Sequence, residues 1–171
     1  MEYPDLFVFP AGHPPSPYDH PVPGGQRLDV PYYEDGKQSS LVLKEGLRLC
    51  AVGWIEKPGF ATGQVPADCI EALVAAHTTK IVRDGIRGIH TCTLCGEDLP
   101  LLRWHDQAIQ LKGHGHYLVR AEKTVYMAPE LLLHYISDHG YCPPQQFVRA
   151  TICGEFLGPD DLEITWRSEG N

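Results

Sequence analysis

The 171-residue sequence has no long apolar stretch, no basic or apolar segment among its first five residues and no excess of basic residues. No apolar run approaches the roughly 18 residues that are needed to cross a membrane. The first five residues contain neither a basic nor an apolar segment, so we expect no signal peptide and a cytoplasmic location. The 14 Lys and Arg against 22 Asp and Glu give a net charge of −8. This balance argues against a broad surface for nucleic-acid phosphates.

Several signatures of catalytic sites are also missing. The sequence has no His-Glu-x-x-His, no glycine-rich phosphate loop, no serine elbow and no protein-kinase motif. It does have six cysteines, but a cytoplasmic chain of this length does not depend on disulfides. Cys92 and Cys95 are separated by two residues. In a reducing compartment this spacing favours metal or redox chemistry.

Proline is concentrated at the start of the chain. Eight of the 15 prolines lie within the first 31 residues, a density that excludes a helix or a central strand there. The one apolar run in this part is Leu6-Phe7-Val8-Phe9. We predict that residues 1–39 form an extended arm, with a short edge strand laid over the body, and that residues 40–171 form a single domain.

Short apolar runs predict strands in the body. Residues 41–43 and 47–55 flank a turn-like Lys-Glu-Gly and suggest a hairpin. Residues 101–104, 108–111 and 117–120 suggest a hairpin or meander, and the sequence near Trp166 suggests a last strand.

Two proline-initiated segments predict helices. One begins at Pro66 and ends near His77, and the other begins at Pro129 and ends before Gly140. Residues 146–152 fit either a short helix or a strand. We therefore predict an α+β fold with short antiparallel strands and two main helices.

The strongest chemical signal lies within residues 88–142. Cys92-x2-Cys95 is followed after 38 residues by His134-x4-His139. Two such pairs supply the four sulfur and nitrogen ligands of a tetrahedral Zn²⁺. Gly96 permits the tight turn that points both thiolates at one ion. The sequence thus predicts a zinc site formed by these two cysteines and two histidines.

The fourth ligand is less constrained, because residues five apart on a helix are about 140° apart around its axis. His139 sits at the helix end, where the last turn can loosen. If His139 does not bind, His90 or Cys142 would replace it. Asp138 could orient a ligand histidine. Otherwise we expect Asp138, like Glu97, Asp98 and Glu130, to be a solvated or capping carboxylate.

The cysteine pair has two alternative uses, a redox dithiol and a catalytic zinc site. A redox dithiol usually lies at a helix N-terminus, but the sequence Gly-Glu-Asp-Leu-Pro after Cys95 disfavours a helix there. A catalytic zinc keeps a coordination position open for water, whereas two Cys and two His ligands make a closed structural site. The residues therefore favour structural zinc.

The Cys92-x2-Cys95 turn, or knuckle, is followed by short strands and then by the helix that carries the two histidines. This order resembles an enlarged Cys2His2 finger or a treble-clef variant. The 38-residue gap is far longer than the 12–15 residues of a usual finger, so a DNA-reading role is not expected. Residues 50–150 also resemble a family of small bacterial proteins of uncharacterised function. The matching motifs are Ala51-Val52-Gly53-Trp54, His90-x-Cys92-x2-Cys95, Tyr126-x-Ala128-Pro129, His134-Tyr135-Ile136-x2-His139 and Gly140-Tyr141-x-Pro143-Pro144-x2-Phe147. The resemblance implies that the body is one unit with a Cys/His site.

These observations favour a small acidic, zinc-stabilised protein that binds another protein. One concrete form is an inhibitor or immunity-type partner of a basic toxin or nuclease, because opposite charge speeds encounter. The first alternative is a metal-dependent hydrolase or nuclease that uses one or more further histidines, namely His90, His105, His114 and His116. The second is a nucleic-acid-binding zinc finger with a local basic surface, drawn from Lys80, Arg83, Arg87 and Arg103. The net charge argues against the second alternative.

Overall fold

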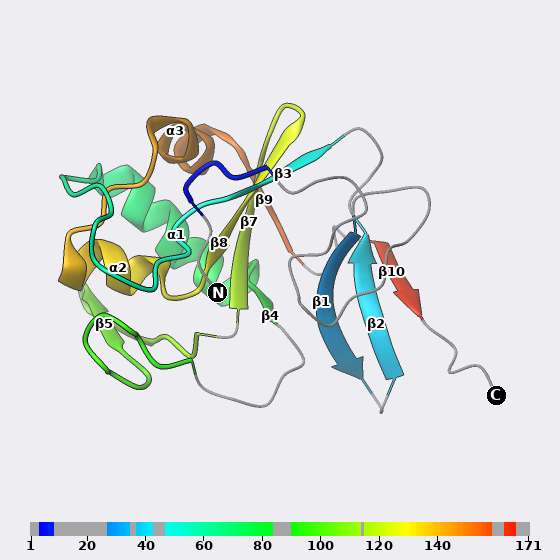
Figure 1. Ribbon diagram of the computed structural model, residues 1–171, viewed down its shortest axis with the longest axis horizontal. Coiled ribbons are helices and arrows are strands. Elements are labelled where there is room, and N and C mark those ends of the chain that lie inside the picture. Colours follow the sequence, from blue (N-terminus) through cyan, green and yellow to red (C-terminus); the bar gives the residue numbers. More distant parts are fainter. Residues whose placement is uncertain are drawn as a thin grey trace.

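The computed structural model describes residues 4–8, 27–34, 37–42, 47–83, 90–113, 115–158 and 163–166. Within them the chain forms three helices and mixed sheets of short strands, so the predicted α+β class is confirmed. Figure 1 shows the three helices grouped on one side of the largest sheet, with a small three-stranded sheet on the other side.

The largest sheet has five strands. Its order is β3 (Arg48–Ala51), β8 (Thr124–Pro129), β7 (Gly115–Ala121) and β4 (Val82–Arg83), and β9 (Glu155–Leu157) also pairs with β7. All pairs are antiparallel except β3 with β8, which is parallel. The prediction of antiparallel strands was therefore wrong for this pair. Parallel neighbours need a long crossover, and here the crossover contains α1 and the Cys-x2-Cys turn.

The remaining strands form two smaller sheets. The first has the order β1 (Arg27–Glu34), β2 (Lys37–Val42) and β10 (Glu163–Trp166). The predicted hairpin between residues 41–43 and 47–55 was wrong, because β2 pairs with β1 and β10 while β3 joins the large sheet. The second is the predicted hairpin of β5 (Leu101–Trp104) and β6 (Gln107–Gln110).

The helices are α1 (Ala67–Thr79), α2 (Leu132–His139) and α3 (Gln145–Cys153). Pro66 directly precedes α1, as its sequence position suggested. Pro129 does not begin α2, because it is the last residue of β8 and pairs with His116. Gly140 ends α2 with φ of 66°, the left-handed conformation that glycine adopts without strain. The third helix, α3, resolves the ambiguity of residues 146–152.

The core lies where the buried helix faces meet the large sheet. Leu73 of α1, Leu132 of α2 and Phe147 of α3 are fully buried together with Tyr117 of β7. Burying one such side chain contributes about 1.5–3 kcal/mol. This packing fixes α2 against α1 and β5 and so determines which way its two histidines point.

Residues 4–8 lie along β3, but in place of the predicted edge strand they form one isolated antiparallel bridge, between Val8 and Cys50. The Leu6 amide donates to the Ala51 carbonyl (2.8 Å), and the Ala51 amide donates to the Phe7 carbonyl (2.9 Å). The Asp5 carboxylate accepts hydrogen bonds from the Gly53 amide (2.9 Å) and the Tyr141 hydroxyl (2.7 Å). The rest of the arm up to residue 26 is outside the described residues, and the division at residue 39 stays a prediction.

Candidate metal centre

Cys92 and Cys95 lie in a tight turn between α1 and β5. The Gly96 amide donates to the Cys92 carbonyl (2.7 Å), and the Cys92 amide donates to the Glu97 carbonyl (3.0 Å). Gly96 has φ of 76°, as the predicted knuckle requires. Residues 93–95 form a turn and not the start of a helix, so the turn lacks the helix N-terminus that activates a redox dithiol.

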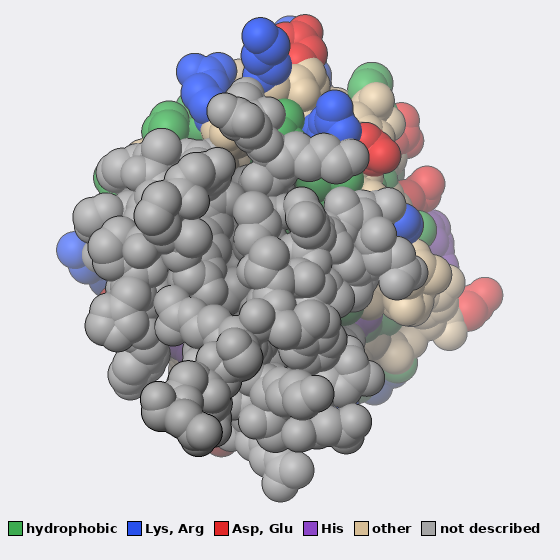
Figure 2. Space-filling view, turned by 90° about the vertical axis from the view of Figure 1, so that its right-hand side faces the viewer, with side chains coloured by type: hydrophobic (Ala, Val, Ile, Leu, Met, Phe, Trp, Pro, Cys, Tyr) green, Lys and Arg blue, Asp and Glu red, His purple; other side chains and the backbone are tan. Residues whose placement is uncertain are grey.

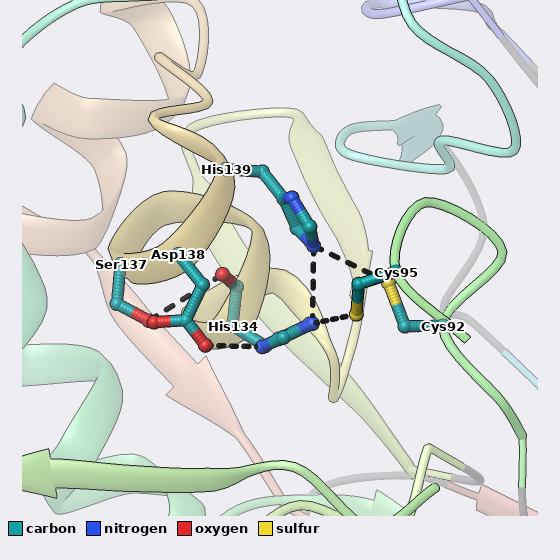
Figure 3. Close-up of polar contacts among 6 residues, drawn as sticks. All are labelled: Cys92, Cys95, His134, Ser137, Asp138 and His139. Carbon is teal, nitrogen blue, oxygen red and sulfur yellow. Dashed lines mark hydrogen bonds and ion pairs between the residues drawn. The ribbon is translucent and has the colours of Figure 1, made fainter. Parts of the chain in front are cut away.

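Helix α2 supplies the two histidines. His134 lies in its first turn, and His139 is its last residue, next to the left-handed Gly140. The two Nε2 atoms are 3.2 Å apart and the ring planes are nearly perpendicular, at 86°. Figure 3 shows both rings pointing toward the two cysteine sulfurs. The i, i+5 spacing therefore does not keep the rings apart.

The four side chains form one compact cluster. Cys92 Sγ is 3.4 Å from His139 Nε2, and Cys95 Sγ is 3.4 Å from His134 Nε2. All four donor atoms lie within 4.8 Å of one another. Tetrahedral zinc, with bonds of about 2.0 Å to nitrogen and about 2.3 Å to sulfur, places two nitrogens about 3.3 Å apart and a sulfur about 3.5 Å from a nitrogen. The cluster fits those separations and could hold a metal ion.

A carboxylate orients His134 from outside the cluster. Asp138 Oδ2 is 2.6 Å from His134 Nδ1, and the Ser137 hydroxyl donates to Asp138 Oδ1 (2.8 Å). The contact places the ring proton on Nδ1, so that the lone pair of Nε2 faces the cysteines (Figure 3). The predicted contact between Asp138 and a site histidine is present.

Burial within the cluster is uneven. Cys92 is fully buried and His134 is 2% exposed, whereas Cys95 is exposed. Burial raises the pKa of the Cys92 thiol. Burial, and then the nearby His134, lowers the pKa of His139, which favours the neutral imidazole that metals bind. A divalent cation would supply the positive charge that a buried thiolate lacks.

The two predicted substitutes do not join the cluster. Cys142 lies against Gly63, and its amide donates to the Ala61 carbonyl (2.9 Å). The His90 amide donates to the Lys112 carbonyl (3.3 Å), and its side chain lines a separate cavity. Among the described residues, the four-donor group is therefore Cys92, Cys95 and the two α2 histidines, and a smaller group of Glu97, His134 and Asp138 shares one histidine with it.

The histidines considered for a hydrolase lie elsewhere. His105 faces Glu71 across 3.7 Å on the exposed surface, and His116 stacks on Trp54 with ring centroids 5.4 Å apart. His114 is outside the described residues. His90, His105 and His116, the described histidines of this set, all lie outside the metal cluster.

A second polar cluster was missed. His77 Nδ1 of α1 is 3.2 Å from the Tyr117 hydroxyl, and His77 Nε2 is 3.7 Å from Glu130 Oε1. Glu130 is fully buried, so it is not the solvated carboxylate that was one of its two expected roles. The signal was present in the sequence, where this carboxylate directly precedes the apolar run Leu131-Leu132-Leu133.

Comparison with known proteins identifies a family without an assigned activity. Residues 31–152 match the family described as Domain of unknown function (DUF7919). No curated protein matches the chain, and no solved structure does. In the described part of the chain, no helix has the length and apolar character to cross a membrane. The resemblance to small bacterial proteins and the zinc-finger likeness stay predictions. Because the match covers most of the chain, the protein belongs to the DUF7919 family.

Proposed function

We propose that Cys92, Cys95, His134 and His139 bind one structural Zn²⁺, and that the protein is a non-catalytic module that binds another protein. The observation that carries the metal assignment is the convergence of two sulfurs and two nitrogens within 4.8 Å. When bound, zinc would join the cysteine turn to the end of α2, across 47 residues of sequence. Structural sites of this kind contribute much of the folding free energy of small proteins.

The donor set supports a structural role. A hydrolytic zinc uses three protein ligands and leaves one position for water. Here the donor atoms of four side chains lie within 4.8 Å of one another, and the described histidines His90, His105 and His116 lie outside this group. Asp138 holds His134 in place and faces it from the side opposite the cysteines.

The charge supports a basic protein partner. A net charge of −8 raises the rate of encounter with a positive surface and disfavours nucleic acid. At the upper edge of the face drawn in Figure 2, described Lys and Arg side chains lie beside Asp and Glu rather than forming a separate basic area. The specific form we propose is an inhibitor or immunity-type protein for a basic toxin or nuclease.

The proposed zinc site is tested by elemental analysis of protein purified without chelators. We expect about one zinc per chain in the parent protein and in Cys153→Ala, whose cysteine is exposed and outside the cluster. The double variant Cys92→Ala, Cys95→Ala should contain none. Cobalt substitution then reads the geometry, because tetrahedral thiolate coordination gives a distinct visible spectrum. Zinc retained by the double variant would disprove the assignment.

A test of the proposed binding to a basic protein needs a purified complex. Affinity enrichment with the metal-loaded full chain, followed by reconstitution with the purified partner, should give a basic protein whose association rate falls steeply with salt. An acidic partner, or an association rate insensitive to salt, would contradict the charge argument while leaving the metal site intact.

A further inference from the structure

A small cavity lies next to the metal cluster. It has a volume of about 50 Å³, and its lining includes Trp54, Glu56, His90, His116 and Tyr135. Tyr135 follows the cluster residue His134 in α2, and its ring centroid is 6.3 Å from that of His139. We call this space the Trp54 cavity. Through Tyr135 it shares a wall with the cluster.

The lining has the composition of a cation site. Trp54 and Tyr135 contribute aromatic rings, and Glu56 carries the one formal charge among the described lining residues, none of which is Lys or Arg. Aromatic rings and a carboxylate together attract cations, whereas the same carboxylate repels anions.

Two of these groups are held in place by the fold. The Trp54 indole donates from Nε1 to the Met127 carbonyl (3.1 Å) and stacks on His116 at an interplanar angle of 30°. Tyr135 is only 2% exposed, and within the described chain its hydroxyl forms no hydrogen bond. The hydroxyl oxygen is not sealed off from the space around it, so a ligand in the cavity that donates hydrogen bonds can use it as an acceptor.

The size of the space restricts the ligand. One water molecule needs roughly 10–15 Å³ measured in this way, so the cavity holds the equivalent of a few waters. That is enough for the head group of a single side chain and too little for a nucleotide or a folded peptide segment. A planar guanidinium suits such a space, because it stacks on aromatic rings and donates several hydrogen bonds.

We infer that the Trp54 cavity receives one cationic side chain, an arginine or lysine, from the partner protein. This inference rests on the proposed function and deepens it by naming the chemistry of the contact. The rings of Trp54 and Tyr135 flank the cation, the Tyr135 hydroxyl accepts a hydrogen bond from it, and Glu56 supplies the opposite charge. The metal cluster supports the site by fixing α2, which carries Tyr135.

The probe for this inference is methylguanidinium chloride, titrated into the ¹⁵N-labelled, metal-loaded full chain. The indole N–H signal of Trp54, identified by its loss in Trp54→Phe, should shift in a saturable way at millimolar concentration. The indole signal of Trp104, which does not line the cavity, should not. N-methylurea, similar in shape but neutral, should bind at least about tenfold more weakly, and sodium chloride corrects for ionic strength. Equal shifts with N-methylurea, or no saturable shift, would overturn the inference.

Variants separate the cavity from general charge effects. Glu56→Gln keeps the shape of the side chain and should weaken methylguanidinium binding about three- to tenfold. The matched control is Glu71→Gln, because the Glu71 side chain is exposed on α1 and lies outside the cavity lining. This variant should leave binding unchanged. Equal effects of the two variants would contradict a specific site.

The outcome is distinguishable from failure of the proposed function. Protein that contains zinc but shows no saturable cation binding overturns the cavity and leaves the metal site standing. Protein that binds methylguanidinium through Glu56 but contains no metal supports the cavity and overturns the zinc assignment. Loss of binding in Tyr135→Phe with unchanged metal content would support the hydroxyl as the acceptor, and unchanged binding would remove it from the site.

Discussion

The described part of the molecule contains two histidine clusters that differ in their partners. In one, His77 lies between the Tyr117 hydroxyl and the Glu130 carboxylate. In the other, His134 and His139 face two cysteine sulfurs. A hydrogen bond with the Tyr117 hydroxyl and the contact with the Glu130 carboxylate at 3.7 Å hold the buried His77 of α1 in place, whereas two sulfurs and two imidazoles are the donors that a metal needs. The partners of a histidine, and not its burial, separate a structural core contact from a candidate metal centre.

Removal of the metal should produce the largest contrast between the two clusters. We expect a strong chelator to lower the free energy of unfolding by several kcal/mol, because a structural zinc links distant parts of the chain. Thermal unfolding measured with chelator and after added Zn²⁺ checks this. The melting temperature should fall by more than about 10 °C and recover. Hydrogen exchange should increase first around the cysteine turn and α2, and later at α1.

The double variant Cys92→Ala, Cys95→Ala is the control for that experiment. Its melting temperature should already be low and should not respond to chelator. A parent protein whose unfolding ignores the chelator would show that the cluster is not a structural metal site.

Glu130→Ala should disrupt the other cluster. The substitution removes a fully buried carboxylate beside His77 and leaves a cavity, so we expect a loss of about 2–4 kcal/mol in unfolding free energy. Denaturant unfolding measures this, and metal content measured on the same sample should stay near the parental value. Loss of metal in Glu130→Ala would mean that the two clusters are coupled rather than independent.

Tyr141→Phe tests how the arm supports the C-terminal end of α2. The buried Tyr141 hydroxyl donates to the Asp5 carboxylate at 2.7 Å, and hydrogen bonds to charged groups contribute about 1.5–3 kcal/mol. We expect a loss of about 2 kcal/mol by denaturant unfolding, with metal content unchanged. Asp5→Asn should lose less than Tyr141→Phe, since its side chain is exposed and its amide oxygen can still accept both hydrogen bonds.

The two clusters also differ in how far sequence reasoning could predict them. The Cys/His cluster could be predicted because Cys-x2-Cys and a histidine pair on a helix are local patterns with a known donor chemistry. The choice of His139 over His90 or Cys142 depended on the left-handed turn at Gly140, which the sequence suggested only in part. The contact of His77 with Tyr117 and Glu130 is nonlocal. It arises because α1 packs near β7 and the turn after β8, and no spacing along the chain encodes that arrangement.

The fold shows the same division. Helix boundaries marked by Pro66 and Gly140 could be predicted, since each residue restricts its own backbone. The parallel pairing of β3 with β8 could not, because it depends on which edge of the sheet a distant strand reaches. The prediction that Pro129 begins a helix was wrong for a related reason. The fixed φ of proline suits a helix start, but it also fits the end of a strand.

Asp138→Asn should have the smallest effect on stability, and it tests how the carboxylate beside the Cys/His cluster contributes to metal binding. The amide can no longer carry the negative charge that orients His134 across the 2.6 Å contact. We expect zinc affinity, measured by competition with a chromogenic chelator, to fall about tenfold. The unfolding free energy of the fully loaded protein should change by less than about 1 kcal/mol, because Asp138 is half exposed. Asp106→Asn, in the exposed β5–β6 turn, is the matched control and should keep the parental affinity. Equal affinities in the two variants would mean that the carboxylate only caps the helix surface, and His134 would then be oriented by packing alone.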